Sequence, residues 1–232
     1  MFLAGMQKLS LLDYPGLVAC TLFTAGCNLR CPWCQNSGLV LPEQFPEKEL
    51  DPEEVLIFLT KRQGVLDGIC ITGGEPLMQR ELPDFLKRVK ELGYRIKLDT
   101  NGSFPEQLRN VVECGLVDYV AMDIKNGPSR YAETTGVPEM TAERFMEAKD
   151  YLLSGGVDFE FRTTVVKGLH SEASLLEAAE WIRGTKAWYL QQFRDSGALI
   201  HADGLSAFSE EEMKNLLSSV QTVIPAAALR GL

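Results

Sequence analysis

Three cysteines lie close together near the start of the chain, in the stretch T-A-G-C-N-L-R-C-P-W-C-Q-N at residues 24–36. Cys27, Cys31 and Cys34 follow the spacing C-x₃-C-x₂-C, and thiols this close in sequence are typical of a metal site. A closed zinc site takes four protein ligands, and an iron–sulfur cluster is usually held by four thiolates. The motif is therefore one ligand short, and the missing ligand must come from elsewhere.

The residues alone leave three interpretations of this loop open. The thiols could be unrelated core cysteines, as we expect of the isolated Cys20, Cys70 and Cys114. They could bind zinc with a remote fourth ligand, although His170 and His201 stand alone in the sequence. They could also hold a [4Fe–4S] cluster whose fourth iron is open to a small molecule, much as a catalytic zinc site keeps one open position.

Composition narrows the class of protein. The chain has 232 residues, 45% of them hydrophobic, which suits a globular protein with a sizeable core. The formal net charge of -9 makes unspecific nucleic-acid binding unexpected. No apolar run is long enough to cross a membrane, and the first residues do not resemble a signal peptide. We therefore expect a cytoplasmic protein with no membrane partner.

Short β-rich runs alternate with helical runs along the chain. The strands are expected at Val18–Thr24, Gly68–Thr72, Tyr94–Thr100, Tyr119–Ile124, Asp158–Val166 and Ala187–Phe193. The helices are expected at Pro52–Gln63, Leu82–Leu92, Pro105–Cys114, Ala142–Ser154, Glu172–Arg183 and Glu210–Ser219. Asp51 stands where it would cap the first of these helices.

Six strand–helix units predict a parallel sheet. A complete eight-stranded barrel typically needs about 250 residues. We therefore expect an incomplete (β/α)6 TIM-like barrel in one domain, with a core at about residues 16–195 and a C-terminal extension at 196–232. We expect the tail V-I-P-A-A-A-L-R-G-L to be a closing strand or packed coil.

Polar motifs fall at the ends of successive expected strands, where parallel α/β folds place their chemistry. The cysteine loop follows the first strand, and Arg162 lies on the fifth. The remaining motifs are T-G-G-E-P at 72–76, D-T-N-G at 99–102, D-I-K at 123–125 and Q-F-R-D at 192–195.

Two of these motifs together resemble the radical S-adenosylmethionine (SAM) superfamily. They are the cysteine motif, with aromatic Trp33 before its last cysteine, and the Gly73-Gly74-Glu75 motif at a strand end. The resemblance implies one [4Fe–4S] cluster held by the three cysteines, with SAM chelating the fourth iron. It also places Trp33 near the adenine of SAM and the G-G-E motif at the methionine amino group.

D-T-N-G and D-x-K resemble a narrower set, the activating enzymes of glycyl radical enzymes. The resemblance puts Asp99 and Asp123 near the methionyl part of SAM, with a monovalent cation as a further expectation. It puts Lys125 and Arg162 at SAM as well, and Arg194 near it, where a related enzyme has a histidine. Taken singly, Asp99, Asp123 and Lys125 are better explained as solvated loop charges or helix caps, and the alternative for Arg162 is a strand residue that reaches solvent.

The opening K-L-S-L-L-D-Y-P-G is similar to activating proteins of anaerobic ribonucleoside-triphosphate reductase. That likeness implies a glycyl radical enzyme, this reductase, as partner, and a flavodoxin or ferredoxin as electron donor. It also implies reductive cleavage of SAM to a 5′-deoxyadenosyl radical, which removes a hydrogen atom from a glycine Cα. Residues 35–69 contain no cysteine, so one cluster is expected.

Two rival functions remain. The first is a radical SAM enzyme that acts on a small molecule, such as a purine-like heterocycle; the D-T-N-G and D-x-K pair favours an activating enzyme over it. The second is a non-enzymatic iron–sulfur electron carrier or a zinc-binding module, against which the G-G-E-P motif at a strand end argues.

Overall fold

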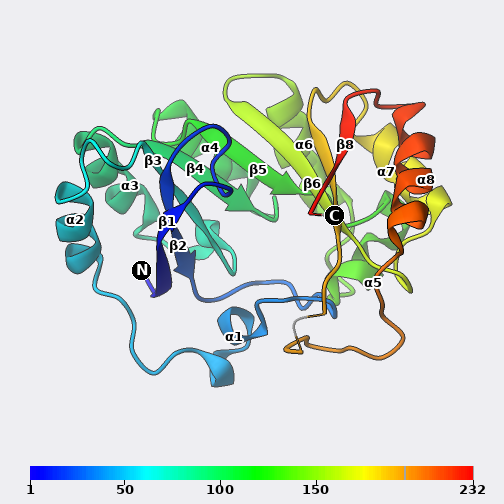
Figure 1. The fold of residues 1–232 in the computed structure, drawn as a ribbon, viewed down its shortest axis with the longest axis horizontal. Coiled ribbons are helices and arrows are strands. Elements are labelled where there is room, and N and C mark those ends of the chain that lie inside the picture. Colours follow the sequence, from blue (N-terminus) through cyan, green and yellow to red (C-terminus); the bar gives the residue numbers. More distant parts are fainter. Residues whose placement is uncertain (196, 232) are drawn as a thin grey trace.

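The computed structural model describes residues 1–195 and 197–231. Ser196 and Leu232, the two ends of the expected C-terminal extension, lie outside the described residues. The described residues form one sheet of eight strands in the order β1 to β8 (Figure 1). The strands are β1 (Leu3–Ser10), β2 (Ala19–Thr24), β3 (Gly68–Gly73), β4 (Arg95–Thr100), β5 (Tyr119–Asp123), β6 (Asp158–Val165), β7 (Trp188–Gln192) and β8 (Ala227–Arg230).

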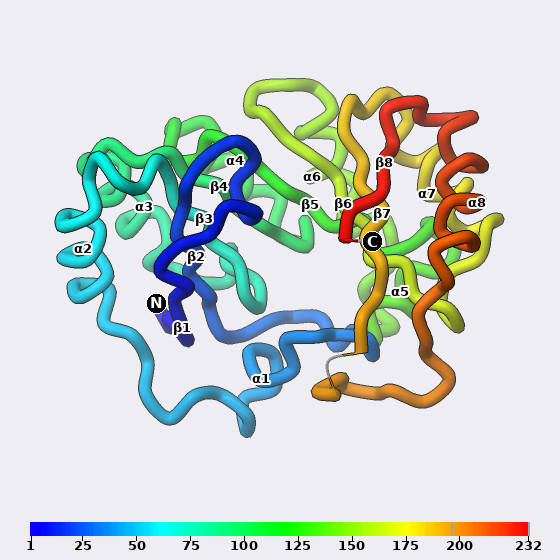
Figure 2. The backbone as a smooth tube through the Cα atoms, in the orientation of Figure 1, coloured from blue at the N-terminus to red at the C-terminus, as the bar shows by residue number. Residues whose placement is uncertain are grey.

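Helices connect the parallel strands and lie around the outside of the curved sheet (Figure 2). The α-helices are α1 (Ser37–Val40), α2 (Pro52–Thr60), α3 (Leu82–Glu91), α4 (Pro105–Glu113), α5 (Tyr131–Thr135), α6 (Glu143–Leu153), α7 (Glu172–Trp181) and α8 (Glu210–Gln221). Three short 3₁₀ helices are η1 (Pro42–Gln44), η2 (Pro76–Met78) and η3 (Pro128–Arg130). Asp51 caps α2 as expected, because its side chain accepts a hydrogen bond from the Glu53 amide.

The predicted open barrel is confirmed, and the six predicted strands correspond to β2 through β7. These strands and β8 pair in parallel, whereas β1 pairs antiparallel with β2 at the other edge. Within the described residues β1 and β8 do not pair with each other, so the sheet stays open. β1 was not predicted, and the tail forms the closing strand β8, one of its two expected states.

The sheet buries its outer face and keeps polar side chains on its inner face. In β4, Ile96 and Leu98 are fully buried towards the helices, while Lys97 and Asp99 alternate with them and point inward. The outward positions of the neighbouring strands are equally buried, at Ile69, Ile71, Val120, Met122, Phe161, Trp188 and Leu190. These residues and the helices that cover them form the core, which therefore lies between sheet and helices. Burial of each such side chain stabilises the fold by about 1.5–3 kcal/mol.

No helix in residues 1–195 and 197–231 combines the length and apolar character that a membrane span requires.

Candidate functional site

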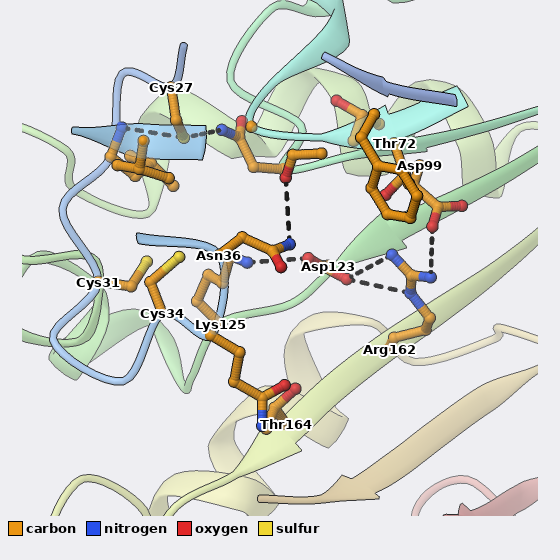
Figure 3. A pocket seen from close by; sticks show the side chains of 18 of the residues that line it. Cys27, Cys31, Cys34, Asn36, Thr72, Asp99, Asp123, Lys125, Arg162 and Thr164 are labelled. Atoms are coloured by element: carbon orange, nitrogen blue, oxygen red, sulfur yellow. Dashed lines mark hydrogen bonds and ion pairs between the residues drawn. The ribbon is translucent and has the colours of Figure 1, made fainter. Parts of the chain in front are cut away.

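The three clustered cysteines line one side of a cavity at the carboxyl ends of the parallel strands (Figure 3). The cavity has a volume of about 420 Å³, a size typical of sites for small molecules. Cys31 is buried, whereas Cys27 and Cys34 are partly buried, and none of the three is in a disulfide. The loop is fixed by its own backbone, since the Gly26 amide donates to the Leu39 carbonyl at 2.7 Å.

The thiols are held in their neutral form by their surroundings. Burial raises the pKa of Cys27 to about 11 and that of Cys31 to about 12, and it raises the pKa of Cys34 as well. The Lys125 ammonium opposes this increase at all three thiols. Binding of a metal cluster must therefore displace protons from these groups.

Among the described residues, no three His, Cys, Asp or Glu side chains are grouped closely enough to hold a single metal ion. Three thiolates bound to one zinc ion would lie about 3.8 Å apart, given a Zn–S distance near 2.3 Å. The three cysteines are therefore not arranged around a single zinc ion in this structure.

Gly73 and Gly74 bring bare backbone against the start of the cysteine loop. The Gly74 amide donates to the Thr24 carbonyl at 2.8 Å, and the Glu75 amide donates to the Gly26 carbonyl at 2.7 Å. Gly73 has a φ of +116°, and a Cβ at Gly74 would collide with the Gly26 carbonyl oxygen. Only glycine fits this approach, and both glycines line the cavity.

Glu75, by contrast, does not line the cavity. Its carboxylate is fully buried and accepts hydrogen bonds from the Leu77 amide, the Thr100 hydroxyl and the Asn101 amide, at 2.7–3.1 Å. These bonds tie the G-G-E-P loop after β3 to the D-T-N-G loop after β4. The structure thus gives Glu75 a place inside the scaffold that holds the two loops together.

Two asparagines that the motif analysis did not single out extend this scaffold to the cysteines. The Asn101 side-chain amide donates to the Cys27 sulfur at 3.8 Å and to the side-chain oxygen Oδ1 of Asn28 at 3.0 Å. Asn28 in turn donates to the Ser103 hydroxyl at 2.9 Å. The loops after β2, β3 and β4 are therefore joined by one hydrogen-bonded network, of which Asn101 is the shared member.

Five charged side chains lie side by side on the inner face of β4, β5 and β6 and in the loop that follows β5. We call them the charged row: Lys97, Asp99, Arg162, Asp123 and Lys125. Arg162 bridges both carboxylates, at 2.9 Å from Asp99 and 3.0 Å from Asp123 (Figure 3). Lys97 pairs with Asp99, and Lys125 pairs with Asp123 at 2.8 Å. Positive and negative charges thus alternate along the row.

The ion pairs decide the charge states in the row. Burial alone would raise the pKa of Asp99, but Arg162 and Lys97 outweigh it and lower that pKa to about 2. The pKa of Asp123 is lowered in the same way by Lys125 and Arg162, again against burial. Burial would lower the pKa of Lys125, but Asp123 raises it well above its ordinary value. Asp99, Asp123 and Lys125 are therefore charged near neutral pH.

Trp33, within the cysteine loop, lines the cavity next to Lys125. The side chain is buried, and its indole N–H has no hydrogen-bond partner among the described residues. The Lys125 ammonium lies 5.1 Å from the centre of the ring, within the range of a cation–π contact. A buried donor without an acceptor is costly, and this N–H has almost no accessible surface, so it is not open to the cavity.

Arg194, like Glu75, is a predicted site residue whose side chain does not line the cavity. It is exposed, and its guanidinium donates to the Gly231 carbonyl at 2.9 Å, so it ties the end of β7 to the end of β8. Gln191, on β7 itself, lines the cavity instead. Gln7, Asp13, Thr21 and Phe23 also line it, from the first two strands and the turn between them.

Comparison with known proteins assigns a family to this architecture. Residues 21–182 match the model of the radical SAM superfamily. The chain is 30% identical over 202 residues to a protein of Methanocaldococcus jannaschii named, provisionally, as a glycyl-radical enzyme activating enzyme, covering 84% of this chain and 81% of that protein. It is also 30% identical over 172 residues to the 7-carboxy-7-deazaguanine synthase of Thermoplasma acidophilum, covering 72% of this chain and 76% of that synthase.

Among solved structures, Streptococcus suis SuiB bound to its precursor peptide SuiA superposes with a TM-score of 0.71 at 14% sequence identity. The match spans 91% of this chain and 48% of the SuiB chain, and at this identity it bears on the fold alone. The chain belongs to the radical SAM superfamily. Membership implies a [4Fe–4S] cluster and SAM, and the cavity suits both: three thiols, bare glycine backbone, the Trp33 side chain and fixed charges share its wall.

Proposed function

We propose that the chain is an activating enzyme that generates a glycyl radical on a partner protein, and that the partner is anaerobic ribonucleoside-triphosphate reductase. The observation that carries the proposal is that the three thiols and the charged residues Asp99, Asp123, Lys125 and Arg162 line one and the same cavity. The similarity to the Methanocaldococcus jannaschii relative over most of both chains supports the subclass.

In this proposal each cavity residue has a separate task. Cys27, Cys31 and Cys34 hold the cluster, and the exposed backbone of Gly73 and Gly74 holds the methionyl group of SAM. When bound, the reduced cluster and SAM together supply the 5′-deoxyadenosyl radical that removes hydrogen from a glycine. Protein side chains bind and orient; no acid or base among them is required.

The remaining residues shape the wall around the bound cofactor. Trp33, which lines the cavity, offers a ring face beside the adenine. Asp99, Asp123, Lys125 and Arg162 form a rigid wall at the methionyl end, because each is fixed by at least one ion pair. Glu75 acts through the loops that it joins, and Arg194 has no task here because its side chain lies outside the cavity lining.

Electron transfer from a flavodoxin or ferredoxin completes the proposal. Both are low-potential carriers, which the reductive cleavage of SAM requires.

One experiment tests the subclass. Anaerobically reconstituted, reduced protein is incubated with SAM and the reductase, and electron paramagnetic resonance records whether the glycyl-radical doublet appears. A doublet that requires SAM and this protein supports the proposal. SAM cleavage to 5′-deoxyadenosine with no doublet contradicts it.

A second candidate function deserves a parallel assay because of the synthase similarity. The relative from Thermoplasma acidophilum matches over 72% of this chain, and this similarity favours testing a small-molecule radical reaction as well. Formation of 7-carboxy-7-deazaguanine by this protein, supplied with the substrate of that synthase, would favour the small-molecule function. The same cavity would serve, with the substrate enclosed rather than presented on a protein.

A further inference from the structure

Lys97 is a charged residue inside the barrel for which neither the motifs nor the proposed function account. It is 2% exposed, and its ammonium group pairs with Asp99 Oδ1. Its other polar neighbour is the Cys70 sulfur, at 3.7 Å. A lone ammonium in such a place would be strongly disfavoured, so the lysine is held there as the counter-charge of Asp99.

All four carboxylate oxygens of the charged row already accept from a cationic side chain. Asp99 Oδ1 accepts from Lys97, and its Oδ2 accepts from Arg162 at 2.9 Å. Asp123 Oδ1 accepts from Arg162 at 3.1 Å, and its Oδ2 accepts from Lys125 at 2.8 Å. Neither carboxylate has an oxygen left without a positive partner.

The charges around the cavity also argue against a further cation beside Asp99 and Asp123. The cavity is lined by one further carboxylate, Asp13, which accepts from the Thr21 hydroxyl at 2.5 Å. With Asp13 included, three carboxylates meet the three cations Lys97, Arg162 and Lys125. A sodium or potassium ion beside Asp99 and Asp123 would lie next to three fixed positive charges and find no oxygen of either carboxylate without a cationic partner, which is unfavourable in a partly desolvated cavity.

The expectation of a monovalent cation near Asp99 and Asp123 therefore does not fit the residues present. We propose that the Lys97 ammonium takes the place of such an ion, so that SAM binds to this protein without any monovalent cation. Lys97 is then a positioning residue. It pairs with one oxygen of Asp99, and the other oxygen of Asp99 holds Arg162 at the cavity wall.

The proposal deepens the proposed function, but it rests only on SAM binding and not on the partner. Protein that binds SAM as described and yet produces no glycyl-radical doublet would refute the activating function alone. A cation requirement for SAM binding would refute the role of Lys97 alone.

The test is the dissociation constant of SAM, measured by anaerobic titration calorimetry on the reconstituted protein. Potassium, sodium and choline chloride are compared at one ionic strength. For the wild-type protein we expect dissociation constants that agree within about twofold across the three salts. A gain in affinity of more than about fivefold on exchange of choline for potassium or sodium would overturn the proposal, whatever the variants do.

Variants at position 97 sharpen the test. Lys97→Met leaves Asp99 with one cation fewer, and we expect SAM to bind about tenfold more weakly in choline and to recover with potassium or sodium. Lys97→Arg keeps the charge and should stay independent of the salt. Unchanged binding by Lys97→Met, or a loss that neither ion reverses, would overturn the proposal; thermal unfolding of each variant in choline confirms that the compared proteins are folded.

Discussion

Single side chains of one motif have different surroundings in this protein. Gly73 and Gly74 line the cavity, whereas Glu75, the next residue, is buried behind it and binds the neighbouring loop. Cys31 is the most buried of the three clustered thiols, at 7% exposure. Substitutions at these positions should therefore separate cofactor binding from the integrity of the scaffold.

Replacement of Cys31 by alanine should abolish cluster binding without unfolding the chain. The thiol is one of the three proposed cluster ligands, and its removal deletes a small side chain at a cost of about 1 kcal/mol in packing. Iron content per chain and far-ultraviolet circular dichroism measure the two effects. Cys114→Ala, at the exposed end of α4, is the matched control and should keep the full iron content. Wild-type iron and 5′-deoxyadenosine formation in Cys31→Ala would refute the assignment.

Glu75 should make the stability of the cluster-free protein fall as the pH rises. Burial raises the pKa of its carboxyl from 4.5 to about 7, although the amides of Asn101 and Leu77 and the Thr100 hydroxyl oppose this. The folded protein then holds the proton more tightly than the unfolded chain. The contribution of this group to stability is therefore fully present below pH 4.5 and is lost as the pH approaches 7.

The comparison with Glu75→Gln isolates this effect. The difference in free energy of unfolding between wild type and variant should decrease by about 3 kcal/mol from pH 5 to pH 8. Urea unfolding of the apoprotein at several pH values measures it, with the exposed Glu106→Gln as control for the loss of one acidic group. A difference that stays constant with pH would contradict the buried, proton-binding carboxyl.

Strands and loops show which parts of the fold the sequence could predict. The six parallel strands were predictable because each carries apolar residues on its outer face and ends in a polar motif. β1 was not, because its exposed Gln7, Lys8 and Leu9 and its Gly5 break the alternation that marks a half-buried strand. Edge strands have one neighbour instead of two, so their sequences carry less of the pattern.

The same reasoning accounts for the site residues that the sequence analysis missed. Lys97 stands two residues before Asp99, so the two side chains share one face of β4, and a charged pair within an apolar strand was the available signal. Asn101 lay within the D-T-N-G motif but had no assigned chemistry. The direction of Arg194 could not be predicted, because its partner is the backbone of Gly231 at the far end of the chain.

Alanine at Gly74 should separate the loops after β2 and β3. Its Cβ would meet the backbone carbonyl of Gly26, which cannot move without displacing the cysteine loop. We expect a loss of about 3 kcal/mol in stability together with weaker SAM binding. Thermal unfolding and calorimetry measure both. Gly5→Ala is the control, because a Cβ there has no atom within 4 Å; equal behaviour of the two variants would argue against the contact.

At the β8 edge of the sheet a charge pair joins β8 to β6, in addition to the apolar packing of Ala227 and Leu229. Arg230 of β8 forms a two-bond ion pair with Glu160 of β6, at 2.7 and 2.9 Å, and its guanidinium lies 3.7 Å from the ring centre of Tyr189. Glu160 is fully buried, and the Tyr119 hydroxyl donates to it at 3.1 Å. The last strand thus supplies the positive charge that a carboxylate inside the barrel needs.

Removal of that charge should be costly unless the carboxylate is removed with it. Arg230→Ala should lose about 2 kcal/mol in the free energy of unfolding, discounted because the arginine is partly exposed. The double variant Arg230→Ala with Glu160→Gln should recover most of this loss, because no unpaired charge remains. Urea unfolding of the four members of the cycle measures the coupling; additive effects would show that the pair is not energetically linked.

The separation of the two faces of the sheet has a consequence for the order of maturation. The apolar layer that stabilises the chain lies between strands and helices, and the charges of the cavity wall neutralise one another without a ligand. The polypeptide can therefore reach its native shape before any iron or sulfide arrives. Cluster loading is then a reaction of the folded protein, in which iron and sulfide are delivered to three thiols that already line a preformed cavity.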